Sequence, residues 1–141
     1  MEQNKLSAQG GCLCQSVKVV ANEVSPSIGA CHCSMCRNWG GGPLLAIDCG
    51  TQVTFEGAEN IATFSSSDWA ERGFCQKCGT HLFYRLKQTG QHIMPVGLFS
   101  DLDEMIFDHQ IFVDEQPNYY CFSNKTKNMT GEEVFAQFAP S

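Results

Sequence analysis

Residues 75–79 read CQKCG, a pair of cysteines separated by two residues and followed by glycine. The C-x-x-C spacing brings two sulfurs to one side of a tight turn, and the glycine supplies the positive φ typical of a zinc-knuckle turn. Near the start of the chain, the C-x-C spacing offers a second pair, because residues i and i+2 of an extended chain face the same side. Zinc in structural sites takes four ligands. We therefore expect one closed site from these two pairs: Cys12, Cys14, Cys75 and Cys78.

Such a site would tie the start of the chain to a turn more than 60 positions later. Structural zinc binds with an apparent free energy of about 10–16 kcal/mol, which would contribute heavily to folding. Four thiolates also suit iron, so the spacing leaves iron as the alternative metal. A thioredoxin-like interpretation of the C-x-x-C pair is disfavoured, because the βαβ context that it needs is missing.

A third group of cysteines stands at residues 31–36, which read CHCSMC. Catalytic zinc sites combine three protein ligands with an exchangeable fourth position. The sulfurs of Cys31, Cys33 and Cys36 would supply those three ligands. In the alternative interpretation the site is closed, with Cys49 as a fourth sulfur.

The neighbours of these cysteines distinguish the two predicted sites. Arg37 follows Cys36, whereas glycine follows Cys78, and this difference indicates entry into a helical turn at residue 36. His32 lies between two ligands, so in an extended segment it points away from their metal. We therefore do not expect His32 to be the fourth ligand.

The cysteine content itself favours metal or thiol chemistry over disulfides. The chain holds nine cysteines, an odd number, and residues 1–5 lack the basic-then-apolar layout of a signal peptide. We therefore expect a reducing compartment, the cytoplasm, where disulfides are rare. The two cysteines outside the three groups, Cys49 and Cys121, are predicted to be small buried hydrophobic residues.

Composition and charge limit the class of protein. Hydrophobic residues make up 43% of the chain and charged residues 17%, which is typical of a globular protein. A length of 141 residues suits a single domain, predicted over residues 6–139. No run approaches the ~20 apolar residues that a membrane span needs. The net charge of −6, without a Lys/Arg run, disfavours nucleic acid as a partner and a nucleic-acid-binding zinc ribbon as the function.

Short β-type runs separated by glycine dominate the sequence, so the fold class is predicted to be mainly β. The ten phenylalanines supply most of the bulky core candidates. Two short helices are expected over residues 33–39 and 130–138. The predicted strands cover residues 17–21, 44–47, 53–55, 61–64, 81–86, 92–99, 111–113 and 119–122.

Three cysteine motifs occur in order along the chain: C-x-C, C-H-C-x-x-C-R and F-C-x-x-C-G. Their stretches, with those that continue the match, are residues 11–14, 31–37, 64–66, 72–80, 97–99 and 109–119. Together they resemble the glutathione-dependent formaldehyde-activating enzyme family, also called the centromere protein V family. The resemblance covers roughly residues 10–122, nearly the whole predicted domain.

The resemblance implies a β-tent fold, in which short antiparallel strands are pinned by a structural zinc ion. The ligands implied for this ion are Cys12, Cys14, Cys75 and Cys78. A second zinc ion is implied at the candidate catalytic residues Cys31, Cys33 and Cys36. The implied activity is that of a carbon–sulfur lyase, acting on a small-molecule thiol adduct such as S-hydroxymethylglutathione.

Other side chains near these motifs are candidates for supporting roles. The candidate general bases are His32, His92 and Ser66, each with a structural role as the alternative. The candidate partners of substrate carboxylates are Arg37, Arg72 and Lys77, with a buried ion pair as the alternative for Arg72 and a solvated side chain for Lys77. The alternative function is a non-catalytic, zinc-stabilised binding module of the same fold.

Overall fold

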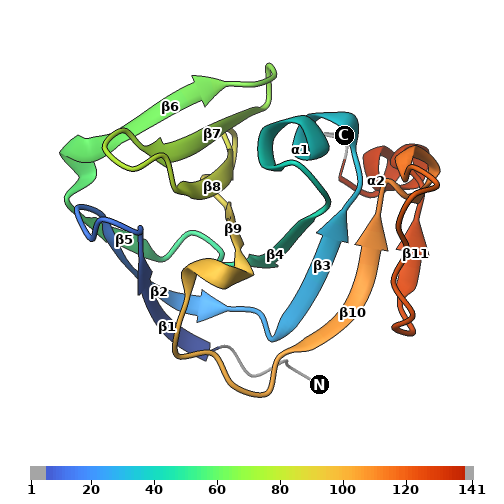
Figure 1. Cartoon of the computed structure of the whole chain (residues 1–141), viewed down its shortest axis with the longest axis horizontal. Helices are drawn as coiled ribbons and strands as arrows, with labels where there is room; N and C mark the ends of the chain where they lie inside the picture. Colours follow the sequence, from blue (N-terminus) through green and yellow to red (C-terminus); the bar gives the residue numbers. More distant parts are fainter. Residues whose placement is uncertain (1–5, 139–141) are drawn as a thin grey trace. The chain divides into compact units, whose positions relative to one another are not determined.

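Short β-strands are the main regular elements of the part of the chain that the structure describes, residues 6–138 of a computed structural model (Figure 1). The strands are β1 (Leu6–Gly11), β2 (Lys18–Val24), β3 (Ser27–Cys31), β4 (Leu44–Asp48), β5 (Val53–Glu56), β6 (Ile61–Ser65), β7 (Ala70–Cys75), β8 (His81–Leu86), β9 (His92–Pro95), β10 (Ile106–Ile111) and β11 (Lys127–Met129). The helices are α1 (Ser34–Gly40) and α2 (Gly131–Phe138), with 3₁₀ turns at η1 (Ala58–Asn60), η2 (Val96–Leu98) and η3 (Val113–Glu115). The mainly β class predicted from the sequence is confirmed.

The contacts between residues divide the chain into two compact units. The first unit runs up to Pro26 and resumes over Ile47–Met105. The second unit consists of Ser27–Ala46 and the residues from Ile106 onward. A single domain over residues 6–139 stays a prediction, and its last residue, Ala139, lies outside the described residues.

In the first unit, β1, β2 and β5 form an antiparallel sheet with β2 in the centre. Side chains alternate along β2, with Val19 and Ala21 buried and Lys18 and Val20 exposed. This period of two is what a sheet with one covered face requires. The predicted strand at residues 17–21 is therefore confirmed, although it extends further, to Val24.

Strands β6 to β9 also belong to the first unit and pair as successive antiparallel neighbours. The buried residues of this unit include fewer aromatic side chains than the composition suggests. The largest fully buried ones, Ile47, Leu82 and Met94, are not aromatic. Phe83 is buried, whereas Phe64 is largely exposed, so the predicted phenylalanine core is realised only in part.

In the second unit, β10 pairs in parallel with both β3 and β11, and the helices α1 and α2 follow β3 and β11 in the sequence. Both helices were expected close to these bounds. The strand predicted over residues 111–113 is wrong beyond Ile111, because Phe112 adopts a left-handed φ of 56° and a 3₁₀ turn follows. Residues 119–122, also predicted as a strand, form none.

Membrane-spanning candidates are absent among the helices of residues 6–138, since neither is both long and apolar enough.

His92, on β9, shows how burial of a titratable ring limits stability at low pH. Its ring packs against Phe83 and Phe55, with centroids 5.1 Å and 5.9 Å away. Burial, and then the charge of Arg85, lower the pKa of His92 below its usual 6.5. His92 therefore binds a proton more tightly in the unfolded chain than in the folded protein. The contribution of neutral His92 to the stability is complete above about pH 6.5, and it is lost as the pH falls from that value through the lower pKa of the folded state.

We expect the His92→Leu variant to lose less stability than the parent protein between about pH 7 and pH 5. The measurement is urea unfolding at several pH values in that window. Both proteins keep the same nine cysteines, so any loss of metal at low pH cancels in the difference. Parallel pH profiles for the two proteins would contradict the prediction.

Candidate functional site

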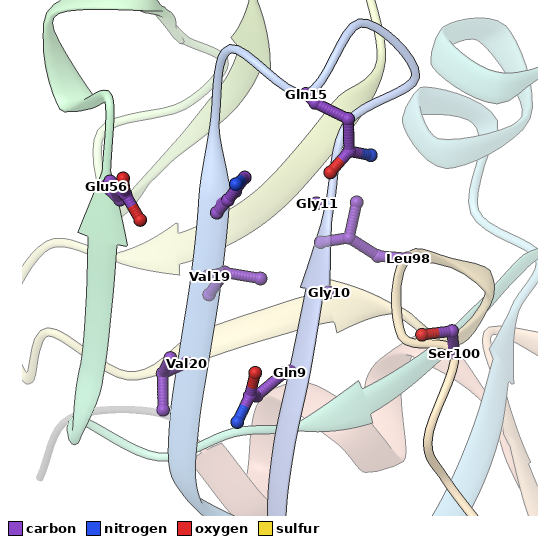
Figure 2. Close-up of a pocket in the computed structure, with 10 residues that line it drawn as sticks. Gln9, Gly10, Gly11, Gln15, Val19, Val20, Glu56, Leu98 and Ser100 are labelled. Carbon is purple, nitrogen blue, oxygen red and sulfur yellow. The ribbon is translucent and has the colours of Figure 1, made fainter.

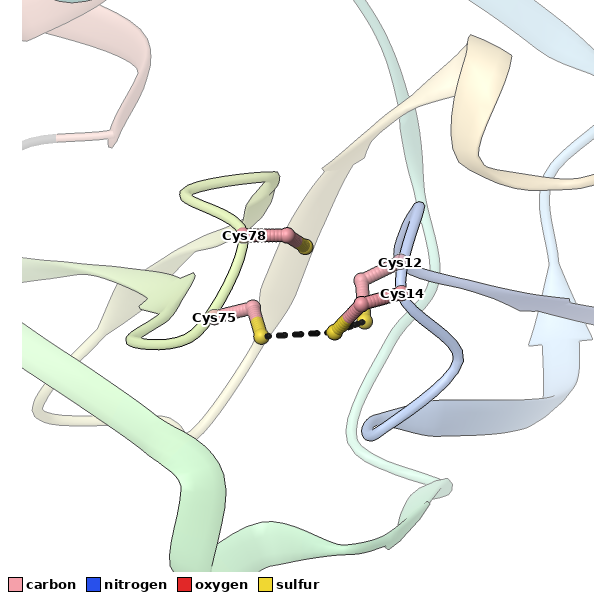
Figure 3. Close-up of side chains that lie close together, drawn as sticks. All are labelled: Cys12, Cys14, Cys75 and Cys78. Carbon is pink, nitrogen blue, oxygen red and sulfur yellow. Dashed lines mark hydrogen bonds between the residues drawn. The ribbon is translucent and has the colours of Figure 1, made fainter.

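Four cysteine sulfurs converge in the first unit (Figure 3). They are those of Cys12, Cys14, Cys75 and Cys78, and all lie within 4.8 Å of one another. The Sγ atom of Cys14 lies 3.6 Å from that of Cys12 and 3.7 Å from that of Cys75. The structure thus brings together all four residues that the sequence predicted to form a closed site.

A knuckle turn between β7 and β8 presents two of these sulfurs. Cys75 is the last residue of β7, and Gly79, after Cys78, has a φ of 80°. The Gly79 N–H donates to the Cys75 carbonyl at 2.7 Å, which closes the turn. Leu13 N–H donates to the Thr80 hydroxyl at 3.1 Å and thereby links this turn to the other pair of cysteines. The predicted glycine-supported knuckle is confirmed.

The other two sulfurs come from a tight turn between β1 and β2, and not from the extended segment that was predicted. Gln15 adopts a left-handed φ of 64°, and its N–H donates to the Cys12 carbonyl at 3.0 Å. Val17 N–H donates to the Cys12 sulfur at 3.3 Å. The turn therefore aims the sulfurs of Cys12 and Cys14 at one point although the chain is not extended.

Hydrogen bonds favour the thiolate, the form in which cysteine binds metals, at Cys78 and Cys14, whereas the pKa of Cys75 is raised. The Thr80 hydroxyl lies 3.2 Å from the Cys78 sulfur, and hydrogen bonds from Thr80 lower the pKa of Cys78 to about 5. Hydrogen bonding by Ser16 lowers the pKa of Cys14.

The separations between the sulfurs fit a zinc ion. With Zn–S distances of ~2.3 Å, tetrahedral geometry places neighbouring sulfurs about 3.8 Å apart. The separations of 3.6 Å and 3.7 Å are close to that value. Four converging thiolates are a donor set typical of structural zinc, and iron is the other metal that they suit.

A second cluster, in the second unit, unites Cys31, Cys33 and Cys36, whose Sγ atoms lie within 4.8 Å of one another. Cys31 ends β3, and Cys33 is the N-cap of α1, where its sulfur accepts a hydrogen bond of 3.3 Å from the Cys36 N–H. The helical turn predicted to begin here is confirmed. Cys36 is buried, whereas Cys31 and Cys33 are partly exposed.

Crowding of the three thiols disfavours a negative charge on Cys31. Contact with Cys33 and then Cys36, followed by burial, raises the pKa of the Cys31 thiol. A cation at the centre of the cluster would reverse this effect, since a coordinating thiol is deprotonated.

Polar residues hold the segment that carries this cluster. Glu115 accepts a hydrogen bond of 2.9 Å from the Ser34 N–H, in the first turn of α1. The Arg37 Nε–H donates to the His32 carbonyl at 2.9 Å. The His32 side chain is fully buried, and its ring nitrogens bond Gln110 and Tyr120. It does not belong to the group of clustered ligand atoms, which agrees with the expectation that His32 is not the fourth ligand.

The glutathione-dependent formaldehyde-activating enzyme family has a family model that matches residues 7–115, a range that includes all seven clustered cysteines. The chain belongs to this family. A Schizosaccharomyces pombe protein described as an uncharacterized lyase is 34% identical over 127 residues, which span 89% of this chain and 93% of that protein. Family membership and this relative indicate a lyase-type function like that of the family.

The fold is also shared with a solved structure. The crystal structure of a Rhodobacter sphaeroides protein, a structural genomics target, superposes with a TM-score of 0.57 at 22% identity. The similarity covers 67% of this chain and 90% of that one. It supports the fold that the family resemblance implied.

Two cysteines of this family member lie outside both clusters. Cys49 is fully buried, as predicted, and burial raises the pKa of its thiol to about 12. It is not among the described residues that group with the three-cysteine cluster. Cys121 is exposed, so its assignment to the core is wrong. It follows Tyr120 in a stretch without strand pairing, where the predicted strand would have buried it.

The remaining candidate side chains have different surroundings. Arg72 is only 4% exposed and lies 5.0 Å from the ring centroid of Tyr84, so a buried structural role describes it best. Lys77 is exposed on the knuckle. His92 and Ser66 belong to the first unit, in which His92 packs against phenylalanine rings.

The sequence interpretation missed three polar residues that hold the second cluster: Gln110, Glu115 and Tyr120. They stand 78 to 88 positions after the residues that they bond. Such separations leave no spacing signal, although residues 109–119 are among the stretches that carry the family resemblance in the sequence.

A groove of about 420 Å³ lies along β1 and β2 of the first unit (Figure 2). Its lining comes mostly from the faces of these two strands and from η2. The residues that line it are Gln9, Gly10, Gly11, Gln15, Lys18, Val19, Val20, Glu56, Leu98 and Ser100. None of the seven clustered cysteines lines the groove.

A matched pair of substitutions tests the four-cysteine cluster, since Cys75 and Cys49 are both fully buried in the first unit. Cys49→Ala removes a packed thiol and is expected to cost about 1 kcal/mol. Cys75→Ala also removes a ligand of an ion bound with about 10–16 kcal/mol, so we expect a several-fold larger loss of stability.

Urea unfolding in buffer containing zinc gives both values. Addition of a strong chelator should then abolish most of the difference between the two variants, because neither protein would retain the metal. Equal losses for the two variants before chelation would contradict a structural role for the cluster.

Proposed function

We propose that this protein is a zinc-dependent carbon–sulfur lyase that cleaves a small-molecule thiol adduct such as S-hydroxymethylglutathione. In this reaction the C–S bond breaks, the hydroxyl proton leaves and the carbon becomes the carbonyl of formaldehyde. The sulfur departs as the thiolate and takes up a proton to give glutathione. The reverse reaction forms the same bond.

The observation that carries the proposal is the three-sulfur cluster of Cys31, Cys33 and Cys36. Three thiolates leave the fourth position of a tetrahedral ion to an exchangeable ligand, as in catalytic zinc sites. Zinc held there would supply a Lewis acid to the sulfur of the adduct and stabilise the thiolate that is released when the C–S bond breaks. Partial exposure of Cys31 and Cys33 supports access for a small molecule.

Arg37 supports an anionic thiol as the substrate. Glutathione carries two carboxylates, and arginine binds carboxylates through two parallel hydrogen bonds. The bond from Arg37 Nε to the His32 carbonyl holds the guanidinium beside the segment that carries the three sulfurs. The protein is otherwise acidic, with a net charge of −6, so a local cation matters for attracting such a substrate.

Metal content provides the first test. Elemental analysis of the purified protein should give about two zinc ions per chain, one for each cluster. The Cys36→Ser variant should retain about one, whereas Cys121→Ser, the same change at an exposed cysteine outside the clusters, should retain both. A parent protein with a single ion would contradict the two-site proposal.

Turnover provides the second test, measured by NMR as the exchange of formaldehyde between its hydrate and the glutathione adduct. Loss of a supporting partner of a metal ligand costs 10- to 100-fold, so we expect loss of a ligand in Cys36→Ser to reduce the rate by more than about 100-fold. The thermal unfolding midpoint should change little, and Cys121→Ser should behave like the parent protein. Full activity in Cys36→Ser would overturn the assignment of catalysis to the three-cysteine cluster. A parent protein without turnover would leave the non-catalytic binding module as the better description.

A further inference from the structure

His32 stands between two of the clustered cysteines and is held by both of its ring nitrogens. Its Nδ1 atom lies 2.7 Å from the Tyr120 hydroxyl, and its Nε2 atom lies 2.8 Å from Oε1 of Gln110. The residue is 0% exposed. A ring with both nitrogens bonded and no contact with solvent is poorly suited to take a proton from the substrate. The hydrogen bonds of His32 therefore point to a structural role and not to acid–base catalysis.

The hydrogen bonds around His32 form a chain with one direction. Thr126 Oγ1 donates its only proton to Asn128 Oδ1 at 2.6 Å, so it accepts from Gln110 Nε2 at 2.8 Å. The Gln110 amide therefore turns its Oε1 towards His32, whose Nε2–H donates. In the neutral ring the Nδ1 atom is then an acceptor, and the Tyr120 O–H donates to it. Burial raises the pKa of Tyr120, which keeps this donor protonated.

Aromatic packing and the backbone fix the same residue. The rings of His32 and Tyr120 stack with centroids 5.5 Å apart and an interplanar angle of 25°. The His32 N–H donates to the Ile111 carbonyl at 3.1 Å, and the His32 carbonyl accepts from Arg37. The position of His32 is thus determined through its side chain and both of its backbone groups.

We propose that His32 is a positioning residue for the three-cysteine cluster, acting through the hydrogen-bonded chain of Tyr120, Gln110, Thr126 and Asn128. In an extended segment adjacent side chains project to opposite sides, so a His32 ring fixed inward turns its two neighbours outward together. The segment leaves β3 at Cys31, and Cys33 has an extended backbone with φ −63° and ψ 154°. The inference rests on the proposed function, since it assigns a support to the same site.

Three residues of this hydrogen-bonded chain lie beyond Glu115, where the match to the family model ends. They are Tyr120, Thr126 and Asn128. The support of the ligands therefore comes from the C-terminal segment of the second unit. Hydrogen-bonded partners of this kind typically account for 10- to 100-fold in metal affinity.

Cobalt binding to the whole protein tests the proposal without relying on activity. The absorption spectrum of the Co²⁺-loaded parent protein minus that of Co²⁺-loaded Cys36→Ser gives the spectrum of Co²⁺ at the three-cysteine cluster. Tyr120→Phe removes one hydroxyl but keeps the stacked ring, and it should weaken Co²⁺ binding at this cluster about 10- to 100-fold and shift its visible bands. Tyr119→Phe, the same change at a tyrosine that is 74% exposed, is the control and should leave both unchanged.

Two further variants keep the test decisive if Tyr120→Phe folds poorly. Thr126→Val preserves shape but removes the acceptor of Gln110, and it should also weaken Co²⁺ binding at the three-cysteine cluster. His32→Asn keeps an acceptor near the Nδ1 position and should retain more affinity than His32→Ala. The thermal unfolding midpoint of each variant separates a loss of fold from a loss of positioning.

The outcomes distinguish this inference from the proposed function. Unchanged Co²⁺ affinity and spectrum in folded Tyr120→Phe and Thr126→Val would overturn the role of His32 and leave the lyase proposal intact. A parent protein that binds Co²⁺ only at the four-cysteine cluster would overturn both. Weakened binding in both variants, with Tyr119→Phe unaffected, is the expected result.

Discussion

The convergence of four cysteine sulfurs within 4.8 Å is the constraint on which the first unit depends. Thiolates at such distances repel one another, so the arrangement calls for a cation at its centre. Closing a loop of more than 60 residues costs conformational entropy that rises only slowly with length. A bound ion therefore offsets that cost by a wide margin. The ion would thus join two turns that lie far apart in the sequence, in addition to the hydrogen bond from Leu13 to Thr80.

The two clusters use the same ligand atom but differ in the backbone that presents it. The knuckle at Gly79 and the turn at Gln15 face each other with two sulfurs each, which completes a tetrahedron. In the second cluster all three sulfurs come from one short segment that runs from the end of β3 into α1. An ion bound by these three sulfurs would have its fourth tetrahedral position open to another molecule. This difference in chain geometry is the physical reason why we propose a structural role for the first cluster and a catalytic role for the second.

Sequence spacing predicted what depends on local geometry. The C-x-x-C-G pattern fixed the knuckle at Gly79, and Arg37 after Cys36 indicated the helical turn that α1 forms. The route by which Cys12 and Cys14 approach each other was mispredicted, because a C-x-C pair satisfies an extended strand and a tight turn equally well. The convergence of the sulfurs was predicted correctly, although the backbone that brings them together was not.

The residues that the sequence did not reveal are placed by contacts between segments that lie far apart in the sequence. The parallel alignment of β3 with β10 places Gln110 opposite the β3 residue Ala30, and no periodicity within either strand signals that register. Tyr120 was assigned to a strand that does not form, so its hydroxyl bond to His32 had no basis in the local pattern. Residues that support a site from a distance are recognisable only once strand order is known.

The parallel pairing of β3 with β10 also sets an order of assembly during synthesis. All four sulfurs of the first cluster have been made once residue 78 has been added. The side-chain hydrogen bonds of His32 cannot form until Gln110 and Tyr120, which lie 78 and 88 positions later, have been synthesised. At roughly 5–20 residues per second, the nascent segment of Cys31, Cys33 and Cys36 spends several seconds without its supports. The cluster assigned to chemistry is therefore the last to be organised, after the chain already has its structural anchor.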